Sequence, residues 1–225
     1  MEKLKHIGFI VDGNRRWARA RGLPTIEGHH KGFDKVEMVI DNLKDTEVEF
    51  VSFYLFSTEN WGRSKEEVDY LMELAEKKIE RLVKKAEQEN LKIVVMGRSE
   101  PVKPKLWAKM MNAEDRTKDN TGLVICICFN YGGHWELADA ATKAIAAGEA
   151  EVTPDILAKY LYHPEVPACD LIVRTSGEQR ISGFQLWRAA YAEFWFMEKA
   201  FPDIETEDCE AAILEYHTRG RRHGK

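Results

Sequence analysis

The residues near the start of the chain that are best suited to chemistry form the stretch Val11-Asp12-Gly13-Asn14-Arg15-Arg16-Trp17. It follows an apolar run of strand length and leads into a basic helix start. Free backbone N–H groups at a helix start attract an anion, Gly13 allows close approach, and Arg15 and Arg16 add charged donors. Asp12 repels phosphate but can hold it through magnesium, which takes oxygen ligands. The stretch predicts a magnesium diphosphate site; the local alternative is an Asp-Gly turn before a solvated basic helix.

A second polar stretch, Ser57-Thr58-Glu59-Asn60-Trp61-Gly62-Arg63, follows another apolar run. If both runs are parallel strands, Ser57, Asn60 and Arg63 lie at the same end of the sheet as Asp12, where such sheets bind ligands. The alternative is a plain loop before the next helix, with Trp61 as a core anchor.

The third stretch begins at Arg174 and reads Arg-Thr-Ser-Gly-Glu-Gln-Arg-Ile-Ser, ending at Ser182. Arg174, Arg180 and Ser182 in a glycine-containing loop are typical of a second phosphate clamp, or else of surface salt bridges. Further along, Glu193 stands directly before Phe-Trp-Phe. A glutamate in such apolar surroundings needs a partner, and a metal or an arginine would provide one.

Several classes of protein are excluded by what the sequence lacks. It contains no Walker-type G-x-x-x-x-G-K-[ST] loop, no G-x-G-x-x-G, no G-x-S-x-G elbow and no Asp-Asp-x-x-Asp. The net charge of −5 gives no global attraction to nucleic acid, so no nucleic-acid partner is expected. Cys126 and Cys128 alternate within an apolar run and are expected to be reduced core residues, which fits a cytoplasmic location.

Strand-length apolar runs alternate with amphipathic segments along all 225 residues. The runs cover residues 7–11, 50–56, 91–96, 123–129 and 171–173, and helices are expected at 30–44, 64–90, 101–117, 134–147, 154–161 and 206–219. Ser64 with Glu67 predicts a capping box, and Thr153-Pro154 a helix start. Strands that alternate with helices and are apolar throughout predict an α/β fold with a mostly parallel sheet covered on both faces. We expect one domain, residues 1–225. The N-terminal apolar segment is too short for a signal peptide or membrane span.

Together these stretches resemble the cis-prenyltransferase family, and within it the bacterial undecaprenyl diphosphate synthase-like members. The resemblance extends from His6 to the C-terminal Arg221-Arg-His-Gly224. It is carried by six ordered motifs: Asp12-Gly-Asn-x-Arg-Trp17, Gly28-His29, Phe56-Ser-Thr-Glu-Asn-Trp61 with Arg63, Asn130-Tyr-Gly-Gly133, Arg174-Thr-x-Gly-Glu178 with Arg180-Ile-Ser182, and Ala190-Tyr-Ala-Glu193.

This resemblance implies a homodimer whose six-stranded, mainly parallel sheet is flanked by helices and encloses a hydrophobic tunnel. It implies Asp12 and Asn60 as catalytic residues and Asp12 and Glu193 as ligands of Mg²⁺. The C-terminal Arg222-His-Gly224 would lie at the dimer interface. Substrate-binding residues would be Gly13, Asn14, Arg15, Arg16, Trp17, His29, Ser57, Thr58, Glu59, Trp61, Arg63, Arg174, Arg180, Ile181 and Ser182.

The implied reaction condenses isopentenyl diphosphate with an allylic diphosphate, such as farnesyl diphosphate, to give a polyprenyl diphosphate such as undecaprenyl diphosphate. A long product would bring peripheral membrane contact. An amide is a poor base, so we expect Asn60 to orient a water or a diphosphate oxygen. The alternatives are a short-chain synthase with a C15 product, a non-catalytic partner subunit, and a nucleotide- or RNA-binding module.

Two positions depart from the family pattern. Thr25 stands where bacterial members often carry an arginine, and Arg21 is a candidate to replace the lost diphosphate contact. Leu55 stands where long-chain members usually have alanine. A leucine flanking the tunnel would obstruct a long tail, because packed interiors tolerate added volume poorly.

Overall fold

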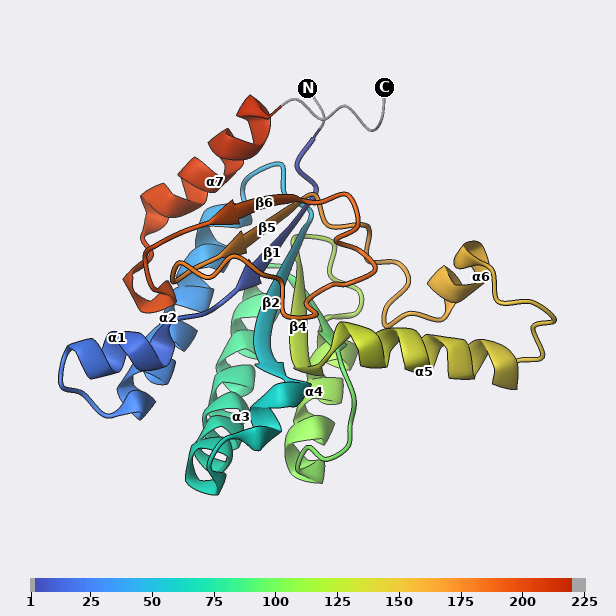
Figure 1. Ribbon diagram of the computed structural model, residues 1–225, viewed down its shortest axis with the longest axis horizontal. Coiled ribbons are helices and arrows are strands. Elements are labelled where there is room, and N and C mark those ends of the chain that lie inside the picture. The colour runs from blue at the N-terminus through green and yellow to red at the C-terminus, as the bar shows by residue number, and fades with distance from the viewer. Residues whose placement is uncertain (1–2, 220–225) are drawn as a thin grey trace.

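Six strands form one sheet in the computed structural model, which describes residues 3–219 (Figure 1). They are β1 (His6–Ile10), β2 (Phe50–Ser57), β3 (Lys92–Met96), β4 (Val124–Tyr131), β5 (Leu171–Arg174) and β6 (Glu193–Phe196). Their order is β3-β4-β2-β1-β5-β6, and all five neighbouring pairs are parallel. The predicted α/β class is confirmed, with a sheet that is wholly rather than mostly parallel. The C-terminal Arg222-His-Gly224 lies outside the described residues.

Seven α-helices and two short 3-10 helices connect the strands within the described residues. They are α1 (Asn14–Ala20), α2 (Thr25–Leu43), η1 (Thr58–Gly62), α3 (Lys65–Gln88), α4 (Pro104–Thr117), α5 (Gly133–Ala146), α6 (Pro154–Lys159), η2 (Phe201–Asp203) and α7 (Thr206–Thr218). Each predicted helix is present. α2 begins earlier than expected because Pro24 precedes its first turn, and proline readily stands at a helix start.

Both faces of the sheet are buried, as the continuous apolar runs predicted. On one face, Phe9 and Phe53 stack within a core that α2, α3, α4 and α7 complete. On the other face, residues 160–192 pack over the strands, with Phe184 stacked on Tyr54. All four cysteines are buried free thiols. Because all neighbouring strands are parallel, their carboxyl ends lie at the same end of the sheet, here called its carboxyl edge.

Local caps fix where the helices begin. The Ser64 hydroxyl accepts a hydrogen bond from the backbone N–H of Glu67 at 3.3 Å, and Thr153 caps α6 in the same way through Ile156. In the described part of the chain, none of the helices is long and apolar enough to cross a bilayer.

Candidate active site

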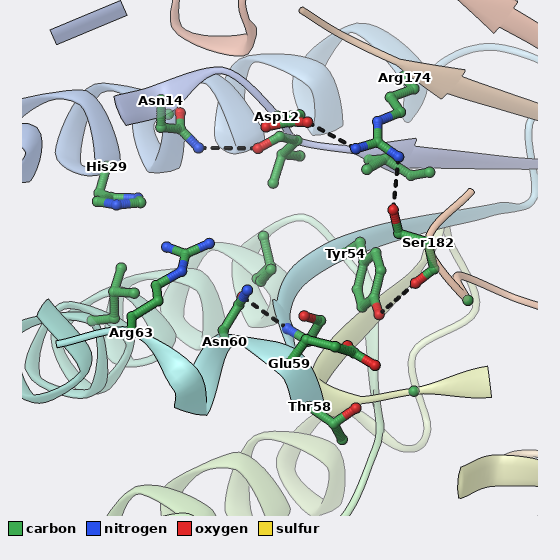
Figure 2. Close-up of a pocket in the computed structure, with 18 of the residues that line it drawn as sticks. Asp12, Asn14, His29, Tyr54, Thr58, Glu59, Asn60, Arg63, Arg174 and Ser182 are labelled. Atoms are coloured by element: carbon green, nitrogen blue, oxygen red, sulfur yellow. Dashed lines mark hydrogen bonds and ion pairs between the residues drawn. The ribbon is translucent and has the colours of Figure 1, made fainter. Parts of the chain in front are cut away.

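A cavity of about 630 Å³ opens at the carboxyl edge of the sheet, where residues from all three predicted stretches meet (Figure 2). Asp12 follows β1, Asn60 follows β2, and Arg174 ends β5. The strands are parallel, so segments that are far apart in sequence deliver their polar ends to one place. The three stretches therefore meet at one end of the sheet, as the sequence predicted.

Arg174 joins two of the stretches through its guanidinium group. Its Nη2 donates to Oδ2 of Asp12 at 2.9 Å, and its Nη1 donates to Oγ of Ser182 at 3.0 Å and to the carbonyl oxygen of Arg180. The side chain is buried. Arg174 is thus a fixed cation that lines the cavity and holds the loop of residues 180–182 against Asp12.

The same loop is held from below by Tyr54 (Figure 2). The Tyr54 hydroxyl lies 3.3 Å from the carbonyl oxygens of both Ser182 and Tyr131. Ser182 has a φ of +50°, a strained backbone that persists only when neighbours impose it. These contacts fix the serine where it faces the cavity, and burial raises the pKa of Tyr54, so its hydroxyl stays protonated.

The turn after β1 depends on glycine in two ways: Gly13 adopts a positive φ, and Gly28 and Gly32 leave room for close helix packing. Gly13 has a φ of +97°, which favours glycine, and its N–H donates to Oδ1 of Asp12 at 2.7 Å. Gly28 and Gly32 in α2 let α1 pack closely. A Cβ at Gly28 would lie 2.0 Å from the carbonyl oxygen of Asn14, and one at Gly32 would lie 2.3 Å from its Oδ1. Asp12 is therefore presented on a tightly packed turn.

A cationic wall adjoins Asp12 and surrounds a second cavity of about 320 Å³. Arg15 and Arg16 come from α1, His29 from α2, and Arg63 from the end of η1. Burial lowers the pKa of His29, and the neighbouring Arg63 lowers it further, so His29 is neutral in the empty protein. Arg19 of α1, which was not anticipated, also lines this cavity. A diphosphate placed here would therefore meet four arginines and a histidine that can take up a proton.

Asn60 is held in a reciprocal cap with Ser57 at the start of η1. The backbone N–H of Ser57 donates to Oδ1 of Asn60 at 3.0 Å. The amide oxygen is therefore engaged, and the NH₂ group is the part of Asn60 that can donate to a ligand. This geometry fits the expectation that Asn60 orients a ligand rather than removing a proton.

Asp12 is the carboxylate suited to a cation in the larger cavity. Within the described residues, no three His, Cys, Asp or Glu side chains lie close enough together to hold a metal by themselves. Magnesium beside phosphates commonly takes one or two carboxylates and completes its shell with substrate oxygens and water. The half-buried Asp12 carboxylate, flanked by Arg16 and Arg174, fits magnesium that arrives with a diphosphate.

The structure does not bring Glu193 to Asp12. Glu193 begins β6 beside Leu171, at the opposite edge of the sheet, and its Oε2 lies 3.3 Å from Nη1 of Arg219. Glu193 is the first residue of a parallel strand and lies at its amino end, whereas Asp12 follows the carboxyl end of β1, so the two predicted Mg²⁺ ligands do not lie together within this chain. A metal role for Glu193 stays a prediction.

Two predicted tryptophans serve as anchors rather than as cavity wall. Trp61 donates to Oδ1 of Asn130 at 2.8 Å and packs edge-on against Phe56, and Trp17 donates to Oδ1 of Asp203 at 2.6 Å. Neither lines the two cavities described here. For Trp61, the core-anchor alternative matches the geometry.

Three further residues for which a role was expected, Arg180, Ile181 and Arg21, also line neither cavity. Arg180 is exposed and pairs with Glu178, and Ile181 packs against the core beneath the loop. Arg21 pairs with Asp203 and stacks on Trp17, 4.4 Å from the ring centroid. Arg21 therefore does not replace the arginine that bacterial members often carry at the position of Thr25.

The remaining predicted residues line one or both cavities, and several further lining residues were not anticipated. Ser57, Thr58 and Glu59 belong to the larger cavity, as predicted. His134 and Trp135 were missed, although they directly follow the Gly132-Gly133 motif that ends at the same edge. Their position shortly after the predicted strand at 123–129 could have identified them as candidates for the cavity lining.

The apolar end of the larger cavity is closed by Phe33, Val36 and Leu55, which also line a separate cavity of about 30 Å³. Leu55 lies where β2 and β4 shift register: Tyr54 pairs with Cys128 and Phe56 with Phe129. Such a bulge re-aims side chains. These three residues line both spaces and therefore lie between the larger cavity and the small apolar one. The hydrophobic tunnel expected from the resemblance stays a prediction.

Comparison with known proteins shows which family this chain resembles. A model of the family described as putative undecaprenyl diphosphate synthase matches residues 10–224. The chain is 40% identical over 225 residues to an isoprenyl transferase of Rickettsia bellii, covering 100% of each chain. It is 39% identical to the isoprenyl transferase of Thermotoga maritima, covering 98% and 96%.

Two solved structures are also similar. Lavandulyl diphosphate synthase from Lavandula x intermedia, in complex with dimethylallyl diphosphate, has a TM-score of 0.92 at 29% identity, covering 98% of each chain. A probable undecaprenyl diphosphate synthase from Campylobacter jejuni has a TM-score of 0.86 at 28% identity, covering 100% of each chain.

Proposed function

This chain belongs to the undecaprenyl diphosphate synthase-like family of prenyltransferases, and from that premise we propose that it condenses isopentenyl diphosphate with an allylic diphosphate, such as farnesyl diphosphate. The observation that carries the proposal is the meeting of Asp12, Arg174 and a cationic wall at the mouth of a cavity with an apolar far end. Charged heads and an apolar tail require this division of the cavity.

The side chains of this site have different roles in the breaking and making of bonds. Arg15, Arg16 and Arg63 stabilise the negative charge that grows on the departing diphosphate as its C–O bond breaks. The allylic carbon becomes cationic as inorganic diphosphate leaves, and the double bond of isopentenyl diphosphate attacks it. The proton lost as the new double bond forms passes to a diphosphate oxygen or to a water. Asp12 would hold Mg²⁺, which when bound adds positive charge beside the leaving diphosphate.

The second substrate belongs on the other side of Asp12. Arg174 and Ser182 face the cavity from the 174–183 loop, and Arg180 lies on the exposed side of that loop. Asn60 lines the same cavity as Arg63 and Arg174, and it can donate from its NH₂ to a diphosphate oxygen (Figure 2). This division supports two diphosphate positions, with an orienting role for Asn60.

For product length, we propose a short chain of the C15 type. The larger cavity has a volume of about 630 Å³, within the range of ordinary small-molecule sites, and Phe33, Val36 and Leu55 close its apolar end. The second candidate is a long product such as undecaprenyl diphosphate. The small apolar cavity beyond the wall favours it, because displacement of the wall would join the two spaces.

We also propose that the chain forms a homodimer. β6 is an edge strand whose aromatic residues Phe194, Trp195 and Phe196 are only half buried, and Tyr191 beside it is exposed. A second copy would cover this apolar edge. Light scattering coupled to size-exclusion chromatography gives the mass in solution.

One experiment tests the proposed reaction and the product length together. Labelled isopentenyl diphosphate is incubated with farnesyl diphosphate, with and without Mg²⁺, and the dephosphorylated product is separated by chromatography. We expect magnesium-dependent incorporation into a single short product. The absence of incorporation under both conditions would refute the transferase proposal, and a long product would select the second candidate.

A further inference from the structure

The carboxylate of Glu67 contacts two arginines and a histidine that belong to three different segments. Its Oε1 lies 2.9 Å from Nη1 of Arg63, 3.3 Å from Nε2 of His29 and 3.6 Å from Nε of Arg15. The Glu67 side chain is only 11% exposed. One buried carboxylate therefore ties together α1, α2 and the segment that joins η1 to α3.

Helix capping does not account for this carboxylate. The Ser64 hydroxyl receives only the backbone N–H of Glu67, and the side chain of Glu67 turns instead toward Arg63 and His29. The predicted capping box is thus only half realised. Burial alone would raise the pKa of Glu67, but Arg63 and Arg15 lower it below its ordinary value, so the carboxylate is charged.

Glu67 stands behind the cations relative to the ligand space. His29 and Arg63 line both cavities and Arg15 lines the smaller one, whereas Glu67 lines neither in the described part of the chain. An anion that enters the cavity meets the cations first. It can therefore bind to their outer faces while Glu67 keeps its contacts behind them.

We propose that Glu67 is a positioning residue that holds Arg15, His29 and Arg63 at the cavity wall before the diphosphate arrives. Long arginine side chains lose conformational freedom when they bind an anion, and a group that orders them beforehand removes that loss from the binding step. This inference rests on the proposed function only in taking a diphosphate as the ligand.

The test uses the full chain with Glu67→Gln, which keeps the shape of the side chain and removes its charge. We expect the dissociation constant for inorganic diphosphate with Mg²⁺, measured by calorimetry, to rise roughly ten- to hundredfold. The KM for the allylic diphosphate should rise similarly, while kcat changes less. Glu67→Asp keeps the charge on a shorter arm and should recover part of the loss.

The matched control is Glu66→Gln, an exposed neighbour in the same first turn of α3. It should bind inorganic diphosphate as the native chain does. Native binding and native KM in Glu67→Gln would overturn the inference, and tighter binding would show that the carboxylate competes with the ligand instead. If Glu67→Gln fails to fold, Glu67→Asp decides, since native binding there contradicts the proposed geometry.

The two proposals fail in different ways. A chain that binds inorganic diphosphate in a Glu67-dependent manner but transfers no prenyl group would refute the proposed function and leave the positioning role intact. A chain that transfers prenyl groups and is indifferent to Glu67→Gln would do the reverse.

Discussion

Nη2 of Arg174 donates a hydrogen bond to Oδ2 of Asp12 across 2.9 Å, and this contact joins the carboxyl ends of β5 and β1. Arg174 is 4% exposed, so its charge relies on Asp12 for compensation in the empty protein. Asp12 thus has a structural role besides its expected role in catalysis. Experiments on this residue must separate the two.

Two substitutions at Asp12 make that separation. Asp12→Ala should abolish turnover and lower the free energy of unfolding by about 1–3 kcal/mol, because Arg174 loses its partner. Asp12→Asn keeps one of the two acceptor oxygens, so either Arg174 or the N–H of Gly13 keeps its partner. It should be nearer native stability than Asp12→Ala, while turnover still falls at least about a hundredfold. Urea unfolding and isopentenyl incorporation measure both. The control is Asp115→Ala, at an exposed position of α4. Substantial activity in Asp12→Asn would contradict a role for the charge.

Asn60→Asp tests the orienting role of the amide. An aspartate can still accept the N–H of Ser57, so the cap at the start of η1 is retained, but the NH₂ donor is replaced by a negative charge beside the diphosphates. We expect kcat/KM to fall roughly a hundredfold with little change in thermal stability. Asn60→Ala, which loses cap and donor together, should be less stable than Asn60→Asp. Full activity of Asn60→Asp with an unchanged pH profile would rule out this role.

The parts of the fold that could be predicted are those set by local pattern and by sheet geometry. Continuous apolar runs identified five strands as buried, and parallel pairing then required Asp12 and Arg174 to share an edge. β6 was not recognised from its residues, because Phe194-Trp-Phe196 is short and only half buried. Without that strand, the sequence did not indicate at which end of the sheet Glu193 lies.

The part of the site that could not be predicted depends on side-chain contacts across helices. Glu67 fits a local capping pattern, and only the tertiary structure reveals that its carboxylate faces Arg15, His29 and Arg63. Phe33 is similar: the sequence places it only within the helix expected at 30–44. Its place opposite Leu55 at the end of the cavity follows from tertiary packing.

Phe33 and Leu55 should jointly limit product length. Leu55→Ala removes one side of the wall, and Phe33→Ala the other, so each should lengthen the product and the double variant should lengthen it most. Chromatography of dephosphorylated products gives the lengths. Val39→Ala removes volume from the same helix outside the cavity lining and should leave product length unchanged. Unaltered products from the double variant would show that the stop lies elsewhere.

His6 should make the stability of the fold depend on pH. Burial lowers its pKa from 6.5 to about 4, although its ring contacts Ser52 at 2.7 Å and the carbonyl oxygen of Pro167 at 3.0 Å. Because the folded pKa lies below the unfolded one, the unfolded chain takes up a proton first as the pH falls from 6.5 toward 4. The free energy of unfolding should therefore decrease by about 2 kcal/mol between pH 7.5 and pH 5 from this group alone.

The measurement is urea unfolding of the native chain and of His6→Asn at both pH values. His6→Asn should be less stable at pH 7.5 but should lose about 2 kcal/mol less on acidification, since it has no imidazole to protonate. His30→Gln, a change at an exposed histidine in α2, should keep the native pH dependence. An equal loss in the native chain and in His6→Asn would mean that His6 is not the group that titrates.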